Sequence, residues 1–161
     1  MALLVRHAMT EAPTTARPDL NAADAAGMMR SHDVGVIPIV EEGKLIGLVT
    51  DRDLVVRVLA QRKDPTTVEL RDIMTKSAVT VTPDTELANA RDRMAEHQIR
   101  RLPVMKGEEL VGIISLGDVA VASASKRMVG EALDEISESS STEPTLSGPD
   151  PGTPERTRSG G

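Results

Sequence analysis

The sequence contains no cysteine and no aromatic residue. Without cysteine, the chain cannot form a disulfide, present a thiolate nucleophile, or ligate zinc or an iron–sulfur cluster through sulfur. Without Phe, Tyr or Trp, it cannot stack nucleic-acid bases on aromatic rings, which is the usual device of proteins that bind single strands. The core must therefore consist of Val, Ile, Leu, Met and Ala.

Basic charge and long hydrophobic runs are also lacking. The formal net charge is −6, whereas proteins that bind nucleic-acid phosphates are normally basic. Only four apolar residues separate Met1 from Arg6, too few for a secretory signal, and no later stretch approaches the length of a membrane span. We therefore expect a soluble cytoplasmic protein that binds neither nucleic acid nor membranes.

What the sequence does contain is an internal repeat. The stretch GLVTDRD at 47–53 returns as GIISLGD at 112–118, and the offset of 65 residues continues backwards without a gap to pair Pro38 with Pro103. A repeat of this kind predicts one structural unit that is present twice.

The repeat divides the chain into two copies, a linker and a tail. The boundaries are expected at residues 3–62 for the first copy, 63–67 for the linker, 68–136 for the second copy and 137–161 for the tail. The tail is rich in Ser, Thr, Pro and Gly and has little to bury, so it is expected to be disordered.

The sequence of each copy predicts a helical turn, a strand, a helix, two strands joined by a tight turn, and a closing helix. β-branched residues and a following proline predict the first strands, at 14–19 and 79–84. Thr85 is the expected N-cap of the next helix in the second copy, and Asn21 or Asp19 takes that role in the first.

Two apolar runs separated by turn residues predict an antiparallel hairpin in each copy, within residues 34–50 and 99–115. Pro38 and Pro103 cannot donate a backbone hydrogen bond, so each is expected at a sheet edge or beside a ligand. The expected fold class is α/β (α+β), with two similar halves.

The end of each hairpin carries a hydroxyl and a carboxylate. Thr50 and Asp53 follow Gly47, and Ser115 and Asp118 occupy the matching positions. At a helix N-terminus the unpaired amides favour an anion such as phosphate, and a glycine allows close backbone approach. An ionised aspartate accepts two hydrogen bonds from a vicinal diol such as that of ribose. The motif therefore predicts a nucleotide site.

The same spacing also fits a capping box, in which both side chains only satisfy amides of their own helix. We favour the ligand hypothesis because the motif occurs twice, each time after an apolar hairpin that could surround an adenine. His32 and His97 end helices and are expected to relieve unpaired carbonyls rather than bind a metal. No residues show metal-ligand or catalytic-triad spacing.

Over about residues 3–125, the repeated Met-Thr, Thr-x-x-Pro-Asp and Gly-x-x-Thr/Ser-x-x-Asp motifs resemble a pair of CBS domains, the module named after cystathionine β-synthase. The resemblance implies two β-α-β-β-α motifs packed sheet to sheet about a pseudo-twofold axis. It also implies frequent homodimerisation and non-catalytic binding of AMP, ADP, ATP or a related adenosyl ligand.

The resemblance further implies which residues contact the ligand. They are Thr15, Val36, Ile37, Pro38, Thr50, Arg52 and Asp53 in the first copy, and Thr80, Arg101, Leu102, Pro103, Ser115 and Asp118 in the second. The aspartates are expected on the ribose and the hairpin residues on the adenine. Because Leu116 and Gly117 stand where the first copy has Asp51 and Arg52, the first copy is the favoured site.

Two hypotheses follow. The first is a regulatory module that binds an adenine nucleotide between its halves and alters a homodimer or the affinity for an unidentified protein partner. The second is a ligand-free scaffold for dimerisation or protein interaction. Under the first, Asp53→Ala is expected to abolish stabilisation by ligand while barely changing the stability of the free protein.

Overall fold

The computed structural model describes residues 2–76 and 79–140. It divides into two units, residues 1–126 and 127–161, and each is described by itself. The first half has helix α1 (Ala22–His32), strands β2 (Val36–Glu41) and β3 (Lys44–Thr50), helix α2 (Asp51–Leu54) and the π-helical turn η2 (Val55–Leu59). The second half has helix α4 (Leu87–Glu96), strands β4 (Arg101–Lys106) and β5 (Glu109–Ser115), and helix α5 (Leu116–Ser140).

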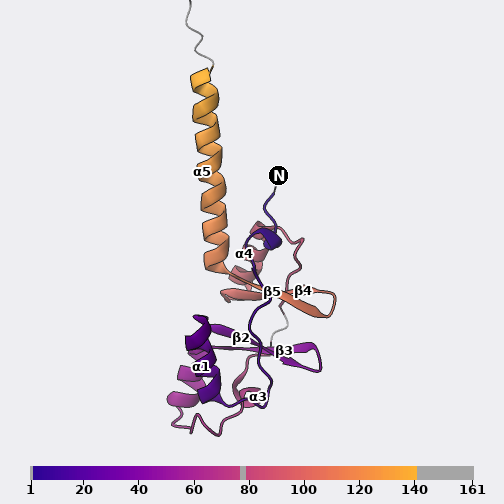
Figure 1. Cartoon of the computed structure of the whole chain (residues 1–161), viewed down its shortest axis with the longest axis vertical. Coiled ribbons are helices and arrows are strands. Elements are labelled where there is room, and N and C mark those ends of the chain that lie inside the picture. Colours follow the sequence, from indigo (N-terminus) through magenta and orange to yellow (C-terminus); the bar gives the residue numbers. More distant parts are fainter. Residues whose placement is uncertain (1, 77–78, 141–161) are drawn as a thin grey trace, which may run out of the picture. The chain divides into compact units, whose positions relative to one another are not determined.

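Three short elements lead into the halves. They are the 3-10 turn η1 (Val5–His7), strand β1 (Thr10–Glu11) and helix α3 (Leu70–Ile73). Figure 1 shows each hairpin beside its own helix, with α1 along β2–β3 and α4 along β4–β5. The mixed helix-and-strand class expected from the sequence is confirmed.

The two hairpins are copies of each other in register as well as in sequence. Pro38 pairs with Leu48, and Pro103 pairs with Ile113. Each ladder is interrupted by a bulge at the same point, between Ile39 and Val40 and at the matching position of β4. Because the register is matched, Thr50 and Ser115 end their strands at equivalent places.

The expected strands at 14–19 and 79–84 are reduced to single parallel bridges, Ala16 to Ile39 and Val81 to Val104. The amide of Ala16 donates to Pro38 O, and the amide of Val40 donates to Ala16 O. A longer ladder would next need the N–H of Pro18 or of Pro38, and proline has none. The matching prolines limit the second copy in the same way.

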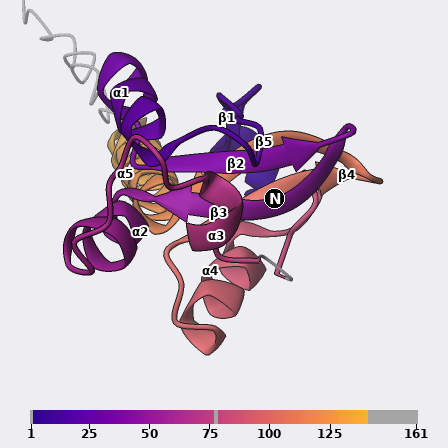
Figure 2. The ribbon, with the colours of Figure 1, turned by 90° about the horizontal axis from the view of Figure 1, so that it is seen from below.

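The segment that leads into each copy packs on the core of the other copy. In the first unit, Val5 N–H donates to Thr85 O, and Leu70 N–H donates to Leu20 O. Strand β1 then pairs with β5, next to which it lies in Figure 2. Contiguous sequence blocks therefore do not coincide with the spatial halves.

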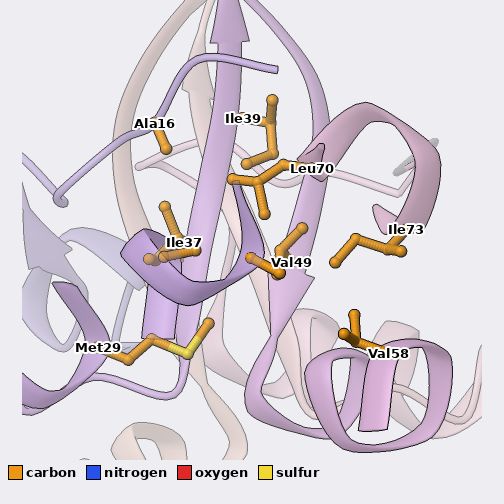
Figure 3. Close-up of a cluster of buried hydrophobic side chains, with 10 residues drawn as sticks. Ala16, Met29, Ile37, Ile39, Val49, Val58, Leu70 and Ile73 are labelled. Atoms are coloured by element: carbon orange, nitrogen blue, oxygen red, sulfur yellow. The ribbon is translucent and has the colours of Figure 1, made fainter. Parts of the chain in front are cut away.

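Two hydrophobic cores result, one under each hairpin. Figure 3 shows the first, in which the side chains of Ile37, Ile39 and Val49 from the hairpin meet Leu70 and Ile73 from α3. We call α3 and η1, with the residues that follow each, the exchanged segments, because each leads into one copy and packs on the other. The second core has Leu102, Val104 and Ile114 at the matching hairpin positions, with Val5 from η1. Aliphatic side chains alone fill both cores, as the composition required.

The helix ends agree only in part with the sequence expectations. Asn21 is confirmed as the N-cap of α1, since its side chain accepts from Asp24 N–H. The prediction for Thr85 is wrong, because Glu86 occupies the N-cap position of α4 and Thr85 Oγ1 instead accepts from Thr82 N–H at 3.1 Å.

The closing helices differ from their expected bounds. The helix expected over 51–62 becomes α2 and the π-helical η2, which ends at Leu59. Helix α5 continues to Ser140, four residues into the segment expected to be disordered from 137. Apart from those residues, the expected tail lies outside the part of the chain that the structure describes.

Candidate functional site

The repeated hydroxyl–carboxylate motifs form two capping boxes. Thr50 N–H donates to Asp53 Oδ2 at 2.9 Å, and Asp53 N–H donates to Thr50 Oγ1 at 3.1 Å. In the second half, Ser115 N–H donates to Asp118 Oδ2 at 2.8 Å, and Asp118 N–H donates to Ser115 Oγ at 3.0 Å. The capping alternative that the spacing left open is therefore present in both halves.

Each capping box uses only one oxygen of its aspartate. A carboxylate has two oxygens and about four lone-pair sites, so capping by Oδ2 leaves Oδ1 of the same group able to accept. In the first half, Oδ1 of Asp53 lies 3.8 Å from Arg57 Nε. In the second half, Ala122 stands at the position of Arg57, and Oδ1 of Asp118 has no hydrogen bond to the described residues. The carboxylate of Asp118 is thus the more available of the two.

Arg57 is a residue of this site that the sequence reasoning did not identify. Its Nη1 donates to the carbonyl oxygens of Ile73 and Met74, at 2.9 and 3.3 Å. The i,i+4 spacing from Asp53 was the available signal. Arg57 therefore joins the start of the first-half closing helix to the end of α3.

The first helical amides differ between the halves as well. Arg52 N–H donates to Oδ1 of Asp51 at 2.8 Å. In the second half, Leu116 has no such acceptor, and Gly117 N–H makes no hydrogen bond to the described residues. Unpaired amides at a helix N-terminus attract anions, so the replacements at 116 and 117 leave a donor open.

Arg101 reaches from the second half to the first. It pairs in register with Ser115, yet a Cβ built on Gly35 would lie 3.0 Å from Arg101 Nη2 and 3.0 Å from Asp51 Oδ2. The guanidinium of Arg101 and the carboxylate of Asp51 therefore flank Gly35. Sequence could place Arg101 on a strand but not across the boundary between the halves.

The other hairpin residues named from the sequence divide into two groups. Ile37, Pro38, Leu102 and Pro103 are buried, whereas Val36 and Arg101 are half-buried. Of the buried group, Ile37 and Leu102 belong to the two hydrophobic cores. An incoming ligand could touch the side chains of Val36 and Arg101 without rearrangement of a core.

The remaining predicted site residues lie at the surface. Thr15 and Arg52 are exposed, and Thr80 is half-buried, with its carbonyl oxygen accepting from Arg93 Nη1 at 2.6 Å. Thr15 and Thr80 immediately precede the bridging residues Ala16 and Val81. They therefore hold equivalent positions in the two halves.

Gly47 does not serve the role expected of it. A Cβ on Gly47 would lie 2.8 Å from Met74 Sδ and 2.9 Å from Thr75 O, and Gly112 has the same relation to Met9 and Thr10. The glycines therefore make room for the exchanged segments. Close approach of a phosphate is not the reason for a glycine here.

An open depression of about 500 Å³ is lined by Thr82, Asp84, Thr85, Glu86, Asn89, Asp92, Arg93 and Glu96, none of which was predicted to contact ligand.

The described residues show neither a metal site nor a membrane helix. No described group of three or more His, Asp or Glu side chains is arranged to hold a metal ion. Among the described helices, none combines the length and apolar character needed to cross a bilayer.

Comparison with known proteins agrees with the resemblance found in the sequence. The family described as "CBS domain" matches residues 5–60 and 70–125. The CBS domain-containing protein YhcV of Bacillus subtilis is 42% identical over 133 residues, which cover 83% of this chain and 94% of YhcV.

Two solved structures are similar to the chain. The hexameric CBS-CP12 protein from bloom-forming cyanobacteria is 32% identical with a TM-score of 0.69, over 75% of this chain and 72% of that one. The CBS domain pair of protein MJ0100, in complex with 5′-methylthioadenosine and S-adenosyl-L-methionine, is 28% identical with a TM-score of 0.71, over 78% of this chain and 99% of that one.

Proposed function

Because the chain belongs to the CBS domain family, we propose that it is a non-catalytic regulatory protein of the cytoplasm that binds an adenosyl ligand beside Asp118. The proposed ligand is AMP, ADP, ATP or S-adenosylmethionine. The observation that carries the proposal is the second capping box, where Oδ1 of Asp118 and the N–H of Gly117 have no hydrogen bond to the described residues. A carboxylate acceptor and an amide donor in one helical turn suit a ribose diol and a phosphate, respectively.

The second half is the preferred site for a further reason of charge. In the first half, Asp51 lies close to the helix N-terminus and would repel a phosphate, while its Oδ1 already accepts from Arg52 N–H. In the second half, Leu116 removes that negative charge. The sequence motifs favoured the first copy, whereas the structure-based proposal favours the second.

The similar CBS domain pair solved with two adenosyl compounds supports this class of ligand. Binding transmits a signal only if two states of the protein differ in affinity for the ligand. We propose that these states differ in how copies of the chain associate, or in how they bind a partner protein.

Calorimetric titration and thermal denaturation with AMP, ADP, ATP, S-adenosylmethionine, 5′-methylthioadenosine and cyclic dinucleotides test the proposal. A ligand at one hundred times its dissociation constant stabilises the fold by about 2.7 kcal/mol. Asp118→Asn should remove most of that stabilisation because it removes the charge, and Asp53→Asn should remove less.

Asparagine is a better replacement than alanine, because the structure shows that both aspartates cap their own helices. Both aspartates accept from a strand-end amide, so alanine would lower stability by about 1 kcal/mol even without ligand. Asparagine keeps an oxygen acceptor in that place. Equal loss of binding in both variants would contradict the preference for the second half.

The scaffold alternative is favoured by one observation. On η2 the apolar side chains of Val55, Val56 and Leu59 are exposed by 54%, 45% and 63%. A surface of this kind suits a homodimer contact without any ligand. Absence of a thermal shift with every compound in the panel, together with a stable dimer in sedimentation, would favour the scaffold over the nucleotide sensor.

A further inference from the structure

We propose that Arg57 determines which half of the chain accepts the ribose of the ligand. It withholds the carboxylate of Asp53 from the sugar, whereas Ala122 at the matching position leaves the carboxylate of Asp118 open. This role rests on the proposed function, and it assigns the difference between the two halves to a single pair of matched positions.

The oxygen that Arg57 faces is the one that capping leaves for a ligand. Asp53 Oδ2 accepts from Thr50 N–H at 2.9 Å, while Asp53 Oδ1 lies 3.8 Å from Arg57 Nε. The side chain of Asp53 is only 13% exposed, so a sugar has little room to approach it. A ribose hydroxyl must come within about 2.5–3.0 Å of the carboxylate oxygen to form a hydrogen bond. It would therefore compete with the guanidinium for the same oxygen.

Arg57 is held in this place by its contacts with α3. Its Nη1 donates to Ile73 O at 2.9 Å and to Met74 O at 3.3 Å. Both oxygens belong to the C-terminal end of α3, where a helix leaves carbonyls without intrahelical partners and favours a cation. Displacement of the guanidinium by a sugar would therefore disturb the end of α3 as well.

The second half has matching surroundings without the cation. Ala8 and Met9 hold the positions that correspond to the end of α3, and both pack, as Ala122 does, against the second core. An alanine side chain has neither a charge nor a hydrogen-bond donor, and Oδ1 of Asp118 has no hydrogen bond to the described residues. An arginine placed at 122 is thus expected to reproduce the arrangement of the first half.

Exchange of the residues at 57 and 122 tests this role, with 5′-methylthioadenosine as the probe in calorimetric titration. The compound has a ribose diol but no phosphate, so the negative charge of Asp51 near the first-half helix does not decide its binding. Ala122→Arg should weaken binding about tenfold or more. Arg57→Ala should raise the number of molecules bound per chain.

The double variant Arg57→Ala with Ala122→Arg should move the site from one half to the other. In this background Asp53→Asn should abolish binding, and Asp118→Asn should have little effect. The opposite order of effects is expected in the unchanged protein. If Asp118→Asn remained the damaging substitution in the double variant, the role of Arg57 would be overturned.

Two further variants separate charge from size. Ala122→Met introduces a long side chain without charge and should bind as the unchanged protein does, whereas Arg57→Lys keeps the charge and should leave the first half closed. Thermal denaturation without ligand confirms that each variant is folded. Equal weakening by Ala122→Met and Ala122→Arg would show crowding and would overturn the role of the charge.

Carboxylate labelling tests the masking of Asp53 without any ligand. A water-soluble carbodiimide activates accessible carboxyl groups, glycinamide then forms an amide with them, and peptide mass spectrometry locates the product. Asp118 should be labelled faster than Asp53 in the unchanged protein. Arg57→Ala should raise the labelling of Asp53 several-fold, and Ala122→Arg should lower that of Asp118.

The two measurements separate a failure of this role from a failure of the proposed function. If the unchanged protein binds none of the compounds in the panel, the proposed function is contradicted. In that case, and also if only phosphate-bearing compounds bind, the labelling decides by itself whether Arg57 masks Asp53. Labelling that neither Arg57→Ala nor Ala122→Arg changes would overturn the role of Arg57, whether or not a ligand binds.

Discussion

The two halves have the same cores but different surfaces at the ends of their last strands. Ile37, Ile39 and Val49 in one core correspond at the offset of 65 to Leu102, Val104 and Ile114 in the other. The charged groups around the two capping boxes do not correspond. Aliphatic packing therefore holds the duplicated fold in common, while the exposed residues at the helix starts determine what each half can bind.

The same contrast extends to the closing helices. In the first half, α2 gives way to η2 and stops at Leu59, whereas α5 in the second half continues to Ser140. The offset that relates the two halves therefore fails beyond the capping boxes, and the second copy alone supplies an apolar helix extension.

The exchanged segments provide the most severe test of equivalence between the halves. Gly47→Ala and Gly112→Ala should each destabilise the protein by about 1–3 kcal/mol, since the new Cβ would lie within 2.9 Å of a backbone oxygen from the exchanged segment. Urea denaturation measures both. A large effect at only one of the two glycines would break the equivalence.

Gly27→Ala is the matched control for this pair. Gly27 lies in α1 with no atom within 4 Å of a built Cβ, so alanine should stabilise the helix by about 0.5–1 kcal/mol. Loss of stability in this variant would indicate that alanine at glycine positions is harmful here for some reason other than contact with the exchanged segments.

The helix N-caps sharpen the comparison at a smaller scale. Asn21→Ala should cost about 1 kcal/mol because its side chain accepts from Asp24 N–H. Glu86 makes no capping hydrogen bond, so Glu86→Ala should change little, and Glu86→Asp should stabilise by about 0.5–1 kcal/mol. Thermal denaturation measures all three, and equal losses from the two alanine variants would contradict the assignment of caps.

The smallest effect on stability is expected at Asp64 in the linker, for which the second half has no equivalent acidic residue. Hydrogen bonds from the side chain and backbone of Thr66 lower the pKa of Asp64 from its ordinary value of 3.8. The ionised form is thus favoured in the folded state, so its contribution is present above pH 3.8 and is lost as the pH falls through the lowered pKa.

Asp64→Asn should therefore be slightly less stable than the unchanged protein at neutral pH, and the difference should vanish in acid. Val129 holds the corresponding position after the second half, so no matching titration is expected there. Denaturant unfolding from pH 6 down to acid measures the difference, and one that grows on acidification would contradict the assignment.

Much of the fold was predictable because the repeat and the hydrophobic pattern agree. The hairpins, the order of the elements and the N-cap at Asn21 follow from local residue types. The strands at 14–19 and 79–84 failed because propensity does not show that two prolines, such as Pro18 and Pro38, remove the donors of one parallel ladder. Thr85 failed as a cap because the helix begins at Leu87, so that Glu86 and not Thr85 occupies the N-cap position.

The site was predictable as a set of residues but not as an arrangement. Spacing alone gave both capping boxes, yet it could not show that a single carboxylate oxygen is used in each. The approach of Arg101 to Gly35 and the exchange of η1 and α3 are contacts between positions far apart in the sequence. No local pattern specifies such contacts, and only the packed chain reveals them.

The exchange of leading segments has a consequence for any polypeptide that carries one repeat alone. Such a chain would lack one wall of its own core, since Leu70 and Ile73 come from the other repeat in this protein. Two single-repeat chains could close both cores only by swapping arms, and the present protein is equivalent to that swapped dimer joined into one polypeptide. Cutting it within residues 63–67 should accordingly yield two fragments that refold only in each other's presence.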